Sequence, residues 1–368
     1  SAEAKGAFAL ERAMIQRDKL ADPLSTMESL QLVLEHSPTI EGLDIALESL
    51  LTQPEVRLDA AKALAPMYQE SGRWDSYVTV LLDTLEDRID VSEKVGVYRQ
   101  VAQVKRDQLQ DLSGAFDALK SAYLLDPDLI EVETELDQLS VEVNRDAEWV
   151  ESLEFALSEV PDREIELRVK IAMISEARLQ DPERAINAYQ EILYQEPEHL
   201  ESLSALERLL KSSERFEELA ELYNNKLEVV TEGPERAEVY ASLASLYERE
   251  LEQPQLAIDT WRRQLEEDAQ HRGAFETLER LLTAEQLFDE LAALYEAWIE
   301  DSADQVASID VRARLASLQT HHLNDGMGAI DIYREIFEIY PAHPGSVSAL
   351  VTLKIVNKEV RVRGRKIL

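Results

Sequence analysis

Cysteine is absent from the 368-residue chain, which excludes disulfide bonds, thiol nucleophiles and thiolate metal sites. This absence leaves the compartment open, and of cytoplasm and periplasm we favour the cytoplasm. Only 11 glycines are present, which is sparse for a fold rich in β-turns. No apolar run approaches the roughly 18 residues that a membrane-spanning helix needs. The sequence therefore predicts neither a disulfide scaffold nor membrane insertion.

Basic residues are also scarce: 38 lysines and arginines face 74 acidic residues, giving a net charge of −36. Such a surface repels nucleic-acid phosphates and anionic lipid headgroups, so we expect no direct nucleic-acid or membrane binding. A partner with a basic segment is the better electrostatic match.

Catalytic motifs are missing as well, since the chain contains no GxGxxG, Walker-type, HExxH or EF-hand pattern. Paired carboxylates such as Glu217 and Glu218 are sequence neighbours on solvated helix faces and do not converge on a cleft. We therefore expect no enzyme activity, no cofactor and no metal.

What the chain does have is an abundance of Leu, Ala, Glu, Gln and Arg, which are strong helix formers. Hydrophobic residues make up 45% of the sequence, enough for a packed core. We expect an all-α protein.

One thirteen-residue phrase recurs at a spacing of 72 residues, as "AINAYQEILYQEP", "AIDTWRRQLEEDA" and "AIDIYREIFEIYP". A weaker copy, "AFDALKSAYLLDP", precedes them. Thirteen residues before each phrase stands another alanine: Ala102, Ala172, Ala244 and Ala316. A fixed period of this kind is the signature of a repeat architecture.

Each period contains four amphipathic segments. Ala185, Tyr189 and Ile192 fall on one helix face, and Asp181 with Pro182 forms a capped helix start. An aromatic residue is predicted to open another helix of each period, and we align Trp74, Trp149, Phe216 and Phe288 at that position, with a three-residue insertion before Trp149. Four segments of about 18 residues are two helical hairpins, which bury their apolar faces by stacking on neighbouring copies.

These positions resemble tetratricopeptide repeats over about residues 54–353. The matching residues of the last copy are Ala316, Ala329, Tyr333 and Pro341. The alternate hairpins match loosely, with Glu207 near a position that the family keeps small. The half-a-tetratricopeptide repeats of RNA-processing scaffolds fit less well. The resemblance implies an α–α superhelix.

The two ends depart from the repeat. Residues 1–53 are predicted to form irregular capping helices. Residues 354–368 hold six basic residues and one acidic residue, with valines and arginines alternating, which indicates a strand or an extended arm. A mobile tail, a truncated neighbouring segment and a docking arm for an acidic surface remain alternatives.

The histidines recur too. His199, His271 and His343 each lie two residues after a repeated phrase, which favours a role in loop capping or packing. His321 and His322 are adjacent on a helix, so their side chains diverge and do not chelate a metal together.

In tetratricopeptide-like superhelices, the first helix of each hairpin lines the concave groove. Carried over by the resemblance, this rule gives a mostly acidic set of candidate groove residues: Glu166, Glu176, Glu238, Glu248, Arg249, Asp310 and His321. The family's clamp for carboxylate termini needs Lys, Arg and Asn at such positions, and these are missing.

We therefore expect a non-enzymatic scaffold that binds protein partners carrying a basic or helical segment. Two alternatives stay open: a self-associating subunit of a larger assembly, and the helical accessory domain of a longer protein.

Overall fold

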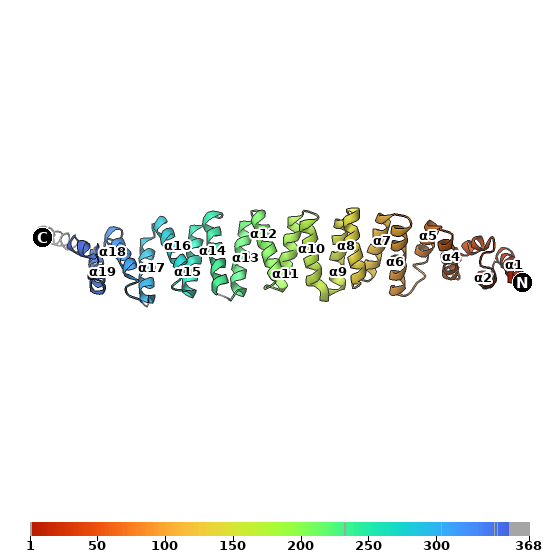
Figure 1. The fold of residues 1–368 in the computed structure, drawn as a ribbon, viewed down its shortest axis with the longest axis horizontal. Coiled ribbons are helices and arrows are strands. Elements are labelled where there is room, and N and C mark those ends of the chain that lie inside the picture. The colour runs from red at the N-terminus through yellow and green to blue at the C-terminus, as the bar shows by residue number, and fades with distance from the viewer. Residues whose placement is uncertain (1, 232, 303, 342, 344, 353–368) are drawn as a thin grey trace. The chain divides into compact units, whose positions relative to one another are not determined.

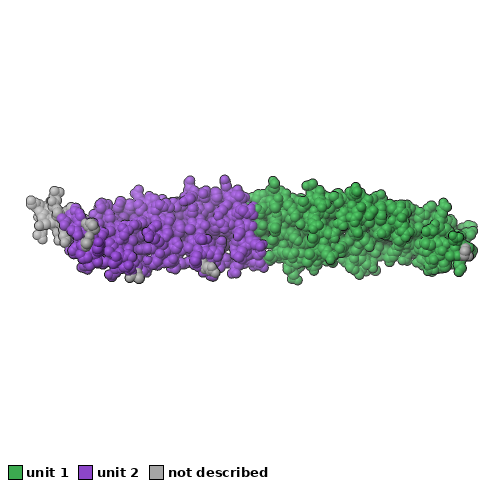
Figure 2. Space-filling view, in the orientation of Figure 1, with its two compact units in different colours: residues 1–192 green, residues 193–368 purple. Residues whose placement is uncertain are grey.

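The computed structural model describes residues 2–231, 233–302, 304–341, 343 and 345–352. The chain divides into two compact units, residues 1–192 and 193–368 (Figure 2). In the described part of both units the regular structure is helical, with no strand, which confirms the predicted all-α solenoid. No helix there is long and apolar enough to span a bilayer. The basic tail, residues 354–368, lies outside the described residues.

The first unit is a series of helices, and from α1 to α10 each packs on its neighbour in the chain (Figure 1). They are α1 (Ala2–Ile15), α2 (Pro23–His36), α3 (Leu43–Leu50), α4 (Arg57–Glu70), α5 (Trp74–Asp83), α6 (Val91–Asp107), α7 (Leu112–Leu125), α8 (Ile130–Val143), α9 (Asp146–Glu159), α10 (Glu164–Ala177) and α11 (Pro182–Gln195), the last of which carries the boundary between units. A π-helical turn (Gln16–Leu20) follows α1, and a 3-10 turn (Pro161–Arg163) precedes α10.

The second unit follows the same plan. Its helices are α12 (Leu200–Ser212), α13 (Phe216–Val229), α14 (Gly233–Arg249), α15 (Pro254–Glu267), α16 (Arg272–Ala284), α17 (Phe288–Asp301), α18 (Ile309–His321) and α19 (Gly326–Ile339). Residues 345–352 are helical again.

Left-handed residues mark the hairpin turns in both units. One set stands at Gln110, Gln180, Glu252 and Asn324, and the other at Gly72, Asn144, Glu214 and Gln286. Seven of these eight residues are not glycine, and they adopt a conformation that costs a non-glycine residue free energy. The same turn is therefore held in place at each recurrence by the helices packed on either side of it.

These turns correct the alignment of one aromatic residue. Phe216 and Phe288 open their helices, whereas Trp149 is the fourth residue of α9, so the predicted three-residue insertion is wrong. Asn144 and Glu214 lie the same number of residues before the first residues of α9 and α13. With these two turns aligned, Trp149 is equivalent to Leu219. Trp149 is fully buried.

Side-chain caps explain where several helices begin. The Asp181 carboxylate accepts a hydrogen bond from the Arg184 backbone N–H at 3.1 Å, which confirms the predicted cap of α11. Asp111 and Asp325 cap α7 and α19 in the same way.

Alanines allow the helices to pack closely around a core in each unit. In the second unit Ala244 and Ala257 are fully buried in one cluster with Trp261 and Phe275. Because these short side chains recur with the repeat, successive hairpins bury one continuous apolar layer.

Candidate functional site

The seven candidate groove residues lie on three helices in two units. Glu166 and Glu176 are on α10 in the first unit. The other five are in the second unit, on α14 and α18: Glu238, Glu248, Arg249, Asp310 and His321. Each unit is therefore considered separately, and only the second carries several candidates.

Three of the candidate carboxylates are bound by arginines of the same unit. Glu166 pairs with Arg163 at 2.7 Å, and Asp310 pairs with Arg314 at 2.6 Å. Glu248 on α14 accepts two hydrogen bonds of 2.8 Å from Arg280 on α16, one on each oxygen. Hydrogen bonds from these arginines hold the pKa of Glu166 and of Glu248 below the ordinary glutamate value. Of these pairs, the one between Glu248 and Arg280 joins two helices, α14 and α16.

Two other candidates are more accessible. Glu238 is exposed on α14, and no other described residue forms an ion pair or hydrogen bond with its carboxylate. Arg249 is exposed at the end of the same helix. His321 is also exposed, and its Nδ1 lies 2.8 Å from the backbone oxygen of Ser317.

Arg249 borders a cleft of about 490 Å³, which we call the α13–α14 cleft. Its lining combines buried apolar side chains with exposed polar ones: Lys211, Phe216, Leu219, Tyr223, Ala241, Ser242, Ser245, Leu246, Arg249 and Glu250. A cleft with an apolar floor and a few polar groups on its rim is the kind of surface that takes a partner side chain.

Two residues that line the cleft, Lys211 and Tyr223, bind a carboxylate that the sequence analysis did not select. Glu207 on α12 accepts a hydrogen bond from the Tyr223 hydroxyl at 2.9 Å and one from Lys211 Nζ at 2.6 Å. Partial burial opposes ionisation of Glu207, but these two donors lower its pKa overall. Burial also raises the pKa of the Tyr223 hydroxyl. The sequence analysis expects a small residue at this position. Glu207 is tolerated there because Tyr223 and Lys211 bind its carboxylate.

The same arrangement recurs in the next copy, with one difference. Glu279 accepts a hydrogen bond from the Tyr295 hydroxyl, as Glu207 does from Tyr223. Its cation is Arg314 of α18, at 2.7 Å. The residue equivalent to Arg314, two positions before the recurrent alanine, is Ser242. The α13–α14 cleft therefore lies where the next copy places an arginine side chain.

The first unit contains a related trio. Asp137 on α8 accepts a hydrogen bond from Trp149 Nε1 at 3.1 Å and pairs with Arg178 at 2.9 Å. An acidic residue, an aromatic donor from the next helix and a cation thus recur in both units. The recurring element is a polar bridge between hairpins, which apolar periodicity does not reveal.

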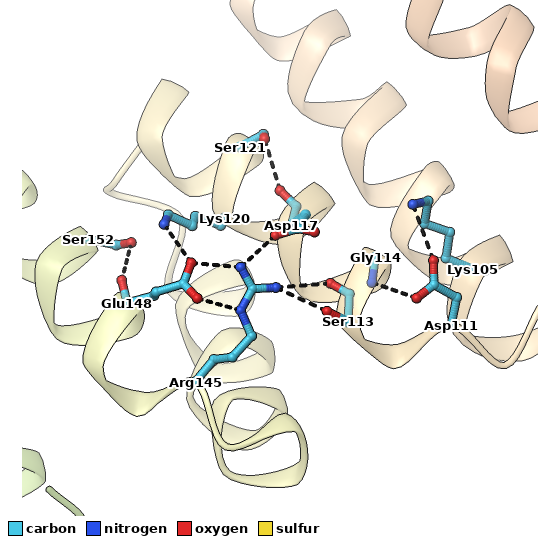
Figure 3. A network of polar contacts seen from close by, with 10 residues as sticks. All are labelled: Lys105, Asp111, Ser113, Gly114, Asp117, Lys120, Ser121, Arg145, Glu148 and Ser152. Atoms are coloured by element: carbon cyan, nitrogen blue, oxygen red, sulfur yellow. Dashed lines mark hydrogen bonds and ion pairs between the residues drawn. The ribbon is translucent and has the colours of Figure 1, made fainter.

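A larger polar network joins α7 to α9 in the first unit (Figure 3). Arg145 forms two hydrogen bonds to Glu148, at 2.7 and 2.6 Å, and an ion pair with Asp117 at 2.8 Å. It also reaches the backbone oxygen of Ser113, and its guanidinium lies 4.3 Å from the centre of the Phe116 ring. Since every polar group of this network has a partner within the chain, we assign it to helix packing.

The remaining histidines are structural. His199 Nδ1 accepts a hydrogen bond from the Ser202 backbone N–H at 3.2 Å, and His271 does the same for Ala274 at 3.1 Å. His343 accepts one from Ser346 at 3.1 Å. The predicted capping role is confirmed. The His322 ring packs on Phe288 with ring centres 4.0 Å apart.

The sequence analysis missed the cleft residues Ser242 and Tyr223, and also Glu207, which Tyr223 binds. A comparison of positions 72 residues apart would have found Ser242, because Arg314 and Ser242 differ in charge where their neighbours agree. Nothing in the periodicity indicates that Tyr223 on α13 reaches back to Glu207 on α12.

Residues 202–238 match the family model described as tetratricopeptide repeat. No curated protein matches the chain. Among solved structures, the chain is similar to a tetratricopeptide repeat protein from Parabacteroides merdae, at 16% identity over 71% of this chain and 99% of that one, with a TM-score of 0.28. It is also similar to YrrB, a tetratricopeptide repeat protein with a peptide-binding site, at 17% identity over 54% and 98% of the two chains, with a TM-score of 0.27.

The helical hairpins recur with the same turns, caps and buried alanines, and the family model matches within them. The chain is a tetratricopeptide-like helical-repeat protein.

Proposed function

We propose that the protein is a non-enzymatic scaffold that binds a protein partner at the α13–α14 cleft and the acidic surface of α14 around it. The observation that carries the proposal is the cleft itself. Its floor is apolar, with Leu219 and Leu246 buried beneath half-buried Phe216. Its rim is polar and accessible at Ser242 and Arg249. A partner side chain can bury apolar area there while its polar end contacts the rim.

The charge balance supports a basic partner segment. Even if each of the 38 basic residues bound one carboxylate, 36 of the 74 acidic residues would lack a cation. Glu238 is exposed on α14, and Glu250, which directly follows α14 and lines the cleft, is exposed as well. A basic segment would be attracted by this field, mainly through its association rate.

The test is affinity capture with the wild-type chain and with the double variant E238K/E250K, followed by identification of the captured proteins by mass spectrometry. We expect the partner to be lost from the double variant and to dissociate from the wild type as salt is raised. The matched control is E217K/E221K, which makes the same change in charge on exposed positions of α13 that do not line the cleft. Equal capture by all three proteins would overturn the proposal.

Light scattering of the purified chain addresses the alternative of a self-associating subunit. A scaffold should stay monomeric without its partner across the concentrations used for capture. A stable oligomer that survives E238K/E250K would instead favour the assembly subunit.

A further inference from the structure

The side chain two positions before the recurrent alanine differs among the four copies of the repeat. In chain order it is Gln100, Lys170, Ser242 and Arg314. Lys170 binds the buried carboxylate of Glu133, and Arg314 binds Glu279. Glu133 is not the equivalent of Glu279, so the informative comparison is between the last two copies, where an arginine that bridges to the preceding hairpin in one copy is a serine in the other.

Arg314 shows how the cation is held. Its Nη1 donates to one oxygen of Glu279 at 2.7 Å, and its Nη2 donates to Asp310 at 2.6 Å. The other Glu279 oxygen accepts the Tyr295 hydroxyl hydrogen bond. The guanidinium is thus clamped between a carboxylate of α16 and a carboxylate of α18, with an aromatic hydroxyl fixing the first.

Both carboxylates are retained where the arginine is missing. Glu207 is equivalent to Glu279, and Glu238 is equivalent to Asp310, each 72 residues earlier. Tyr223 and Lys211 both donate to Oε1 of Glu207, and no described residue donates to Oε2. Oε2 of Glu207 and the carboxylate of Glu238 are therefore both available to accept hydrogen bonds from an arginine.

We propose that Glu207, Glu238 and Ser242 form an arginine-binding site, in which the guanidinium of a partner segment takes the position that Arg314 fills in the next copy. The proposal deepens the scaffold function and rests on it for its biological partner, but the site itself stands on the comparison between the two copies. We call these three residues the open cation position.

A guanidinium fits this position better than an ammonium. Its planar fork presents two nitrogens to two separate acceptors, whereas lysine offers one compact charge that is more strongly hydrated. Two cations of the chain itself, Lys211 and Arg249, oppose the binding of a guanidinium at the open cation position. Lys211 is already bound to Glu207 and is 52% exposed, so it can swing toward solvent. Arg249 lies seven residues after Ser242, about 10 Å along the helix axis, and Glu250 beside it offsets its charge.

The test uses a small probe, N-acetyl-arginine amide, titrated into the isotope-labelled full chain and followed by the backbone amide signals of Glu238 and Ser242. We expect saturable shifts at these residues. N-acetyl-lysine amide should bind about fivefold or more weakly because it lacks the fork. N-acetyl-citrulline amide has a similar shape without the charge and should produce no saturable shift. Equal binding of the citrulline and arginine probes would overturn the proposal.

Two reciprocal variants sharpen the test. S242R supplies the arginine within the chain, as in the next copy, and should abolish probe binding while leaving the fold intact. R314S removes the arginine from the next copy and should create a second probe site, seen at the amides of Asp310 and its neighbours. Probe binding by S242R with unchanged affinity would refute the site, even if R314S failed to fold.

The outcomes separate this inference from the scaffold function. Probe binding that S242R abolishes, with no partner captured from cells, would uphold the site and leave the scaffold proposal without support. Capture of a partner that depends on Glu238, together with no saturable probe binding, would uphold the scaffold and overturn the arginine site.

Discussion

Arg145 shows how much structure one side chain can organise. It precedes α9, contacts α7 through Ser113 and Asp117, and holds Glu148 with two hydrogen bonds. These bonds, with a smaller contribution from Lys120, lower the pKa of Glu148 to about 2. Since a carboxylate with a lowered pKa stabilises the fold only while ionised, its contribution is present above the ordinary glutamate pKa and is lost as the pH falls toward 2.

We predict that R145Q lowers the stability of the first unit at pH 7 by about 1–2 kcal/mol, a value reduced for solvent screening because the Glu148 side chain is 39% exposed. The difference between wild type and R145Q should shrink between pH 4.5 and pH 2, since protonation of Glu148 removes the same interaction. Urea midpoints at pH 7 and pH 3 measure it.

The matched control is R272Q, which breaks a pair with Glu276 whose side chains are 84% and 55% exposed. R272Q should lower the free energy of unfolding by only about 0.3–0.5 kcal/mol, and this difference should vary little with pH. A constant difference between wild type and R145Q at both pH values would show that Arg145 acts through packing on Phe116 and not through Glu148.

At the scale of the helix, the sequence predicted those features that local chemistry dictates. The Asp181 cap and the histidine caps follow from residue type and position in the loop, and the structure has them. Trp149 was misplaced because residue type was used as the guide, whereas the left-handed Asn144 sets where the helix begins. The bridge from Tyr223 to Glu207 depends on the packing of two helices, which no local pattern encodes.

The caps lead to a prediction for α16. We expect H271A to lower the stability of the second unit by about 1 kcal/mol, because the backbone N–H of Ala274 loses its acceptor. H271D supplies a carboxylate oxygen at the same position and should recover most of the loss. Hydrogen exchange of the Ala274 amide, with the urea midpoint, measures both variants.

Mutation of an exposed residue in the same loop, Gln270→Ala, serves as the control and should change neither observable much. If H271A and H271D were equally destabilised, the role of His271 would be packing and not capping.

At the scale of the whole molecule, two electrostatic effects compete. Ion pairs tie helices together in each unit, such as Lys120 with Glu148 and Arg236 with Glu267. Most are partly exposed, and each is worth about 1 kcal/mol or less. Against them stands the repulsion among the surplus carboxylates of a chain with net charge −36. Salt weakens both effects, so the sign of its effect on stability reveals which is larger.

We predict that repulsion is larger, because 74 acidic residues face only 38 basic ones. Raising NaCl from about 0.02 to 0.3 M shortens the screening length from roughly 20 Å to 6 Å, which suppresses repulsion between neighbouring helices while direct pairs lose less. A net gain of about 1 kcal/mol in a unit of this size would raise the Tm by about 2–4 °C. Calorimetry across the salt series measures it, and KCl should act as NaCl does if screening is the cause. A Tm that falls with salt would mean that the ion pairs between helices, and not the relief of repulsion, dominate the electrostatics of the array.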